Sequence, residues 1–139
     1  MVIDSVLMGS HVFALGETHL EQGETVTLPG FKEYFASHGK GKGVSVFSRM
    51  ECVNRPVVNE VSSPIFSAIH YRSVKFDTIF LYWSSNCTSE ETCEILGLLE
   101  SWILDERPTA IIGDFNIKFS EDNKINRTME KSGFQQLLH

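Results

Sequence analysis

The stretch Thr78-Ile79-Phe80-Leu81-Tyr82-Trp83 is a nearly continuous apolar run in the middle of the chain. Runs of this kind are typical of strands that lie inside a sheet and are covered on both faces. We therefore predict a central strand over residues 78–83. Similar strand patterns precede it, rich in β-branched and aromatic residues and bounded by turn residues. They lie at residues 11–15, 31–35, 44–48, 56–61 and 65–71.

The glycine-rich segment 39–43 is predicted to be a flexible turn, which makes the strands before and after it a hairpin. The strand after this turn alternates apolar and polar residues over 44–48, so it is expected to be half-buried. A Walker phosphate-binding loop is not predicted here, because that motif needs a Ser or Thr after its Gly-Lys pair.

Residues 88–104 carry the clearest helix pattern. Thr88 or Ser89 can cap the helix, and glutamates follow in its first turns, where they favour the positive end of the helix dipole. Its apolar residues fall at helical spacing and form one face. They are Ile95, Leu98, Leu99 and Trp102.

A strand is predicted at 109–112, after Pro108, and a weaker helix at 122–132, with Gly133 as its C-terminal stop. Strands therefore dominate the first half and helices the second. This order indicates an α+β or layered α/β fold rather than repeated βαβ units. The length of 139 residues fits a single domain over 1–139.

The amino-acid composition indicates which classes of protein fit this chain. An apolar content of 42% is typical of a globular chain, and no apolar run reaches the ~20 residues that a membrane span needs. The net charge of −6 disfavours a basic nucleic-acid-binding module, although bound cations can offset acidic ligands locally. Three cysteines without a paired spacing indicate free thiols. We therefore expect an intracellular protein, cytoplasmic or nuclear, that does not enter membranes.

The string Ile111-Ile112-Gly113-Asp114-Phe115-Asn116 joins a predicted strand to two polar side chains. A strand buried on both faces stays apolar until it emerges, and Gly113 lets a backbone or a substrate approach closely. Asp114 and Asn116 then point to the same side. A carboxylate can orient or deprotonate water, and a carboxamide can donate a hydrogen bond to a phosphate oxygen. The alternative is a turn held by Asx hydrogen bonds.

Glu17 stands in a similar context, directly after Gly16 at the end of the strand predicted over 11–15. A carboxylate at this position can bind Mg²⁺, which prefers hard oxygen ligands and few protein contacts. The alternative is a surface acid at a strand end. Tyr82 lies at the end of the central strand, where a phenol either packs at the rim of the core or hydrogen-bonds a phosphate.

These strings together resemble the endonuclease/exonuclease/phosphatase family, and most closely the apurinic-type endonuclease domains of non-LTR retroelements and related mobile elements. The resemblance covers nearly the whole chain, and the order of the strings agrees with it, as does the helix before the last one. Four stretches carry it: Phe13-Ala14-Leu15-Gly16-Glu17-Thr18-His19-Leu20, Gly41-Lys42-Gly43-Val44-Ser45-Val46-Phe47-Ser48, Leu81-Tyr82-Trp83-Ser84-Ser85, and Ile111-Ile112-Gly113-Asp114-Phe115-Asn116-Ile117.

The resemblance implies a partial four-layer α/β sandwich that hydrolyses phosphodiesters or phosphomonoesters with Mg²⁺ or Mn²⁺, and it implies DNA as the partner. It implies that Glu17 is a metal ligand and that Asp114 orients and activates the attacking water. The resemblance also implies that Asn116 holds the phosphate and stabilises its transition-state charge. Tyr82 matches a family tyrosine that contacts the phosphate.

The chain departs from the family pattern in several places. Trp83 stands where arginine is frequent, and serines follow it where proline is common. No asparagine precedes Glu17, and the chain stops at His139 without the Ser-Asp-His-like motif of the family. We therefore expect the middle of such a domain, with exposed strand edges that invite self-association and with weak or lost endonuclease activity.

Two alternatives remain open. The first is a degenerate, non-catalytic domain that serves as an interaction module or has no function. The second is a phosphatase of the same family acting on a lipid or inositol phosphate.

Overall fold

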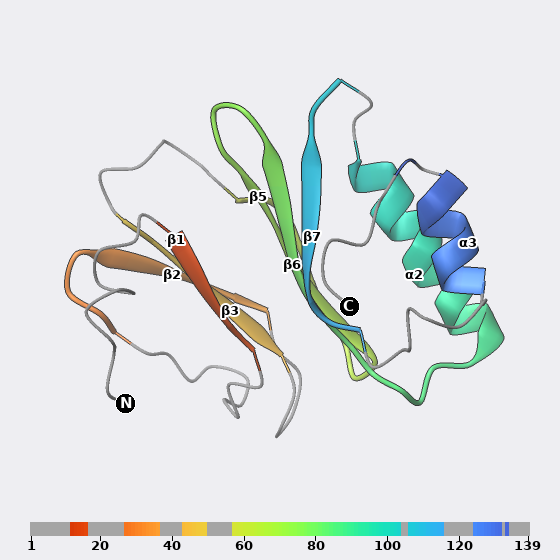
Figure 1. Ribbon diagram of the computed structural model, residues 1–139. Helices are drawn as coiled ribbons and strands as arrows, with labels where there is room; N and C mark the ends of the chain where they lie inside the picture. The colour runs from red at the N-terminus through yellow and green to blue at the C-terminus, as the bar shows by residue number, and fades with distance from the viewer. Residues whose placement is uncertain are drawn as a thin grey trace.

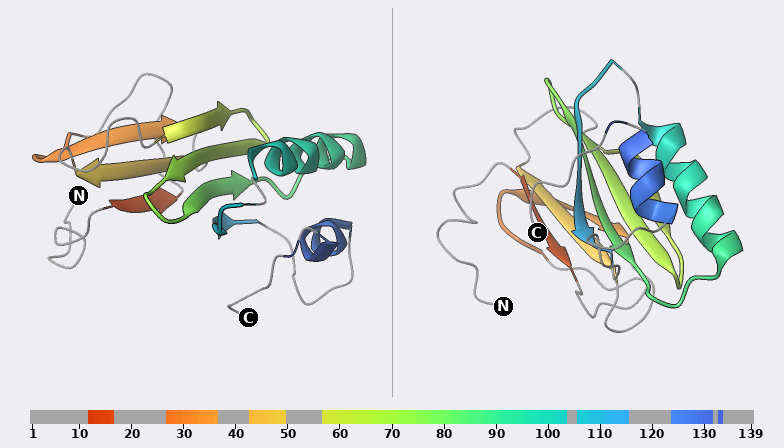
Figure 2. Two further views of the ribbon diagram at one scale, coloured as in Figure 1. Left: turned by 90° about the horizontal axis from the view of Figure 1, so that it is seen from above. Right: turned by 45° about the vertical axis from the view of Figure 1, so that its right-hand side comes forward.

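The computed structural model describes residues 12–16, 27–36, 43–49, 57–103, 106–115, 124–131 and 133. Within these residues, seven strands form two sheets and two helices lie beside the larger sheet (Figure 1). The sheets pack against each other, and the helices cover the opposite face of the larger sheet (Figure 2). The prediction of a mixed α and β fold is confirmed at this level.

The smaller sheet contains β1 (Val12–Gly16), β2 (Phe31–Ala36) and β3 (Val44–Arg49), in the order β1-β3-β2. Both pairings are antiparallel, and β2 and β3 form the predicted hairpin. The expectation that 44–48 is half-buried is wrong, because all five residues are buried. The strand is the middle one of its sheet: Val46 packs towards the larger sheet, and Phe47 packs with Phe31 in a separate apolar cluster.

The larger sheet contains β4 (Val57–Ser62), β5 (Phe66–Arg72), β6 (Asp77–Trp83) and β7 (Thr109–Asp114), in that order. The first two pairings are antiparallel, whereas β6 and β7 run parallel. The predicted central strand is confirmed, since β6 has a neighbour on each side. Its residues Ile79 and Leu81 belong to the main apolar core, which α2 covers.

Helix α2 (Ser89–Trp102) begins at a capping box. The Thr88 hydroxyl accepts a hydrogen bond from the Glu91 backbone amide, and the Glu91 carboxylate accepts one from the Thr88 amide, each at 3.1 Å. Such a cap stabilises a helix by about 1 kcal/mol. The residues buried by the helix follow the predicted face in part: Leu98 is only half-buried, and Leu96 is buried in addition. The buried residues are Ile95, Leu96, Leu99 and Trp102.

Helix α3 (Lys124–Lys131) lies beside α2 (Figure 1), and Met129 packs against the same core. Gly133 follows with a φ of 86°, and its amide donates a hydrogen bond to the Glu130 carbonyl. Because this left-handed conformation favours glycine, the predicted C-terminal stop is confirmed.

Strand β7 differs from its prediction. We expected a strand buried on both faces, and this is wrong for the described residues. Among them β7 pairs only with β6, and its cleft-side residues, including Ile112 at 54% exposure, reach the surface. The apolar pattern of 109–112 therefore belongs to an edge strand of the described sheet.

No helix among the described residues has the length and hydrophobicity that a bilayer crossing requires.

Candidate functional site

Tyr82 and Asp114 lie opposite each other near the carboxyl ends of β6 and β7. They are Cα partners in the parallel register, so the two side chains emerge on the same face of the sheet. That face points to the smaller sheet, because the alternate residues Leu81 and Trp83 pack into the core beneath α2. Tyr82 is half-buried and Asp114 is exposed. The structure thus brings together these two of the predicted site residues.

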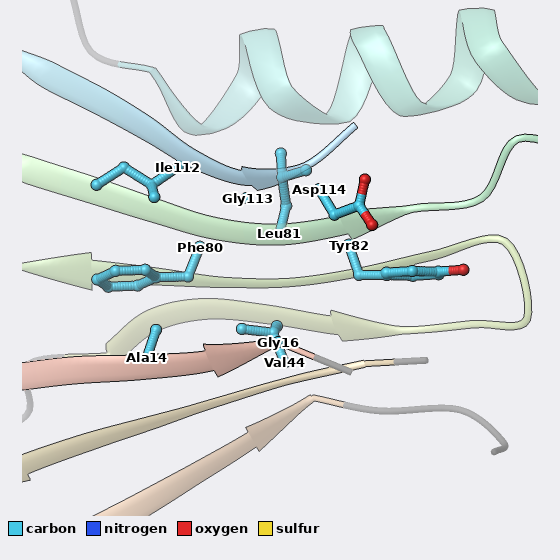
Figure 3. Close-up of a pocket in the computed structure, with 9 residues that line it drawn as sticks. All are labelled: Ala14, Gly16, Val44, Phe80, Leu81, Tyr82, Ile112, Gly113 and Asp114. Carbon is cyan, nitrogen blue, oxygen red and sulfur yellow. The ribbon is translucent and has the colours of Figure 1, made fainter. Parts of the chain in front are cut away.

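A cleft of about 260 Å³ lies between β1 and the β6–β7 pair. Ala14, Phe80 and Ile112 line its apolar end, whereas Tyr82 and Asp114 line its polar end (Figure 3). The cleft has one acidic and one phenolic group beside an apolar wall. This combination suits a ligand that carries both a polar group and a flat or aliphatic part.

Gly16 lines the same cleft from β1. It is the last residue of that strand and directly precedes Glu17 in the sequence. Glu17 and Asn116 both lie outside the described residues. Their assigned roles, metal ligand and phosphate donor, remain predictions.

Gly113 places Asp114 close to β6. A Cβ at position 113 would overlap the backbone carbonyl of Leu81, so a side chain does not fit there without movement of the strand. The close approach predicted for this glycine is therefore present, and the group that approaches is the neighbouring backbone. Glycine here lets β7 pair tightly with β6 directly before Asp114.

The described polar groups of the cleft are hard oxygen donors, a carboxylate and a phenol. Of these two groups the carboxylate is the kind of ligand that Mg²⁺ and Mn²⁺ prefer, and Mg²⁺ needs only one or two protein carboxylates because it keeps several waters. The donor chemistry therefore fits an ion of this class. Over the described ranges, no cluster of three or more His, Cys, Asp or Glu residues is arranged to hold a metal ion.

A second polar cluster, which the sequence did not predict, lies at the other end of β6. Asp77 is completely buried at the first position of the strand. Its carboxylate accepts hydrogen bonds from Arg72 Nη2 at 2.9 Å, from Arg107 Nε at 2.8 Å and from His70 Nε2 at 2.8 Å. Three cationic or polar donors thus surround one carboxylate.

His70 is held in one tautomer. The Asn59 side-chain amide lies 3.0 Å from Nδ1, and because an amide nitrogen can only donate, Nδ1 accepts and Nε2 carries the proton towards Asp77. The ring also stacks on Trp102 of α2, with centroids 5.8 Å apart. His70 is therefore fully engaged beneath the helix.

The pKa values reflect these contacts. Burial alone would raise the pKa of Asp77, but the hydrogen bonds from Arg72, His70 and Arg107 outweigh it and hold the pKa well below its usual range. Burial lowers the pKa of His70, and the neighbouring Asp77 only partly offsets this effect. Near neutral pH the cluster therefore contains a carboxylate, two guanidinium groups and a neutral imidazole.

Part of this cluster has a signal in the sequence. The turn at residues 73–76 joins two predicted strands, and pairing across it puts Arg72 opposite Asp77. A charged residue that adjoins an apolar run needs a partner if it is buried, so the basic residue opposite it is a signal that could have indicated an ion pair. Arg107 carries no comparable signal, because it approaches Asp77 only through the long connection from β6 to β7.

A scan of protein-family models gave no match for this chain, and a search of curated proteins gave no relative. The assignment of the candidate site therefore rests on its geometry.

Proposed function

We propose that this protein is a divalent-metal-dependent phosphodiesterase of the endonuclease/exonuclease/phosphatase type that acts on DNA as an endonuclease, like the domains of mobile elements. In this proposal the two packed sheets and the helices over the larger one are part of a four-layer α/β sandwich. One arrangement supports it. Tyr82 and Asp114 lie side by side at the carboxyl ends of parallel strands, in a cleft that Gly16 also lines.

In the proposed reaction, the Asp114 carboxylate orients a water molecule beside the phosphorus and takes its proton. The water oxygen forms the new bond to phosphorus and the bond to the leaving sugar oxygen breaks. That oxygen keeps the electron pair and takes a proton from solvent. The Tyr82 hydroxyl donates a hydrogen bond to a non-bridging phosphate oxygen, and the Asn116 amide donates a second. Glu17 would hold Mg²⁺ or Mn²⁺, which supplies Lewis-acid stabilisation of the phosphate charge when bound.

Nicking of supercoiled plasmid in Mg²⁺ tests the proposal, because a single cut converts the substrate to a visible relaxed form. The Asp114→Ala variant should cut about 10²–10⁴-fold more slowly than the parent, the usual loss for a general base. Glu100→Ala is the matched control, since Glu100 is an exposed acid on α2. Equal cutting by the parent and Asp114→Ala would refute the role of Asp114 and would point to a contaminating nuclease.

Thermal unfolding with and without Mg²⁺ tests the ion separately from turnover. At a concentration 100 times its dissociation constant, a bound ion should stabilise the parent by about 2.7 kcal/mol. The shift should disappear in Glu17→Ala. A shift that persists unchanged in Glu17→Ala would exclude Glu17 as a ligand.

A second candidate function, a non-catalytic interaction module, has its own supporting observation. β1 and β7 are edge strands of the described sheets, and both line the cleft, so the two edges lie on the same side of the sandwich (Figure 2). Residues 109–113 carry no charge, and Ile112 is exposed on this side. Uncharged edges of this kind pair readily with other strands.

Sedimentation at increasing protein concentration tests this candidate. The parent should self-associate, and Ile112→Lys should disperse the assembly because it places a charge on the edge. Val74→Lys is the matched control, since Val74 is an exposed apolar residue in the turn between β5 and β6. A parent that stays monomeric, or an assembly that both variants weaken equally, would remove the candidate.

A further inference from the structure

We propose that Arg107 and Asp77 form a register clamp that fixes the start of β7 against β6, so that Asp114 comes to lie beside Tyr82 at the other end of the strand pair. In this proposal Arg107 and Asp77 are positioning residues. Their effect on a reaction rests on the proposed function, whereas their effect on strand register does not.

The pairing of β7 with β6 is weakly specified by packing. The cleft-side residues of β7, Ala110, Ile112 and Asp114, are all exposed, and the helix-side residues Thr109 and Ile111 are only half-buried. Register is strongly fixed where one face of a strand is fully buried, and it is prone to slip where neither face is. A two-residue slip would keep each side chain on its present face and would still move Asp114 away from Tyr82.

The contacts at the start of β7 fix the register that packing leaves weakly specified. Arg107 Nε donates to Asp77 Oδ1 at 2.8 Å, and Arg107 Nη2 donates to the Ser73 carbonyl at 2.6 Å. The Asp77 backbone amide donates to the Pro108 carbonyl at 2.9 Å. The two residues before the strand are therefore attached both to β6 and to the turn that leads into it.

The attachment is strong because Asp77 is itself held in place by its neighbours. Its side chain is fully buried, and His70 and Arg72 of β5 hold the carboxylate from the other side. A charge-assisted hydrogen bond to a fixed carboxylate gives both energy and geometry. Gly113 adds a second restraint near the other end, because no Cβ fits against the Leu81 carbonyl at that position.

Arg72 provides a matched control within the same cluster. It donates to Asp77 from β5, at 2.9 Å, and it is partly exposed as Arg107 is. Removing Arg72 breaks an ion pair with the same carboxylate and leaves every contact to β7 in place. A general loss of stability should follow from either variant, whereas a loss of register should follow only from Arg107→Ala.

Engineered disulfides can measure the register directly. In a background where Cys52, Cys87 and Cys93 are replaced by Ser, the pair Tyr82→Cys with Asp114→Cys reports the observed register. Neighbouring strands lie about 4.8 Å apart, within the roughly 4.4–6.8 Å between Cα atoms that a disulfide spans. The pair Phe80→Cys with Asp114→Cys reports a slip by two residues, because Phe80 is opposite Ile112.

The ratio of the oxidation rates of the two pairs is the readout. With Arg107 intact, the 82–114 pair should form faster. Arg107→Ala should lower the ratio about tenfold or more, as expected for losing a charged hydrogen bond, whereas Arg107→Lys should restore part of it and Arg72→Ala should leave it unchanged. Equal ratios in Arg107→Ala and Arg72→Ala would overturn the clamp.

This experiment does not depend on catalysis, since Asp114 is replaced in both pairs. If the parent shows no nicking, the proposed function fails and the disulfide ratio still decides the clamp. If the parent does nick DNA, Arg107→Ala should lower kcat with little change in KM, and Arg107→Lys should recover part of it. Arg72→Ala should retain the parent kcat.

Discussion

The two ends of the β6–β7 pair each carry an aspartate, and the two aspartates stand in opposite environments. Asp77 is fully buried and accepts hydrogen bonds from three side chains, whereas Asp114 is exposed at the edge of a cleft. A buried carboxylate needs such partners, since its desolvation would otherwise be prohibitive. An exposed carboxylate in a cleft can receive a ligand. Asp77 therefore stabilises the fold, whereas Asp114 is accessible to a ligand.

The largest expected effect on stability comes from a substitution at the buried end of the β6–β7 pair. Asp77→Ala should lower the free energy of unfolding by about 3–5 kcal/mol, because it leaves the guanidinium groups of Arg72 and Arg107 without their carboxylate. Urea denaturation followed by tryptophan fluorescence measures this, since Trp83 and Trp102 are both buried. A loss below about 1 kcal/mol, typical of exposed ion pairs, would show that the cluster does not anchor the sheet.

The next effect is at the glycine before the exposed acid. Gly113→Ala should lower the free energy of unfolding by about 1–3 kcal/mol, because the new Cβ overlaps the Leu81 carbonyl. Gly97→Ala is the matched control in α2. Nothing lies within 4 Å of a Cβ there, and the change should raise the free energy of unfolding by about 0.5–1 kcal/mol. The same sign for both variants would contradict the close approach of β7 to β6.

A smaller effect is expected from the titration of His70. Its pKa is lowered in the folded state, so between that pKa and the unfolded value of about 6.5 the unfolded chain binds the extra proton. The free energy of unfolding should therefore fall as the pH is lowered below about 6.5, by at most ~1.4 kcal/mol per pH unit.

Denaturation at a series of pH values, with the parent and His70→Gln side by side, isolates this contribution. Glutamine keeps a donor towards Asp77 and has no proton to gain. The difference between the two curves should slope downwards below pH 6.5 or so, following the unfolded histidine. A flat difference curve would mean that His70 titrates equally in both states.

The smallest effect on stability is expected at the exposed end. Asp114→Ala should change the free energy of unfolding by no more than about 0.5 kcal/mol, as is usual for surface positions, even where it abolishes nicking. The same urea titration used for Asp77→Ala measures it. Comparable losses for the two aspartates would erase the distinction between the two ends.

Much of the fold is visible in the sequence because it depends on local patterns. The helix of 88–104 and the central strand of 78–83 are long and strongly periodic, and both appear where predicted. The burial of Ser45 and Ser48 was not predicted, since serine in an alternating strand resembles a solvent-facing residue. Ser48 is instead satisfied by a buried hydrogen bond of 3.0 Å to the hydroxyl of Tyr71 in the other sheet.

The candidate site also has features that local sequence patterns indicate and features that they do not. Strand-end context drew attention to Tyr82 and Asp114, and the family resemblance gave them their predicted roles; the parallel register sets them opposite each other. Whether β7 lies inside a sheet or at its edge is a question of neighbours, and no local pattern encodes neighbours. For the same reason Arg107 was not foreseen as a partner of Asp77, which lies 30 positions earlier in the chain.

The parallel pairing of β6 and β7 also has a consequence for how the chain folds. β4, β5 and β6 are joined in series by tight turns, whereas β7 returns to β6 only after the crossover of residues 84–108. Contacts between segments distant in sequence carry a larger loop-closure entropy and tend to form late. The cleft with Asp114 should therefore assemble last, and transient opening of the native protein should release β7 before the antiparallel strands.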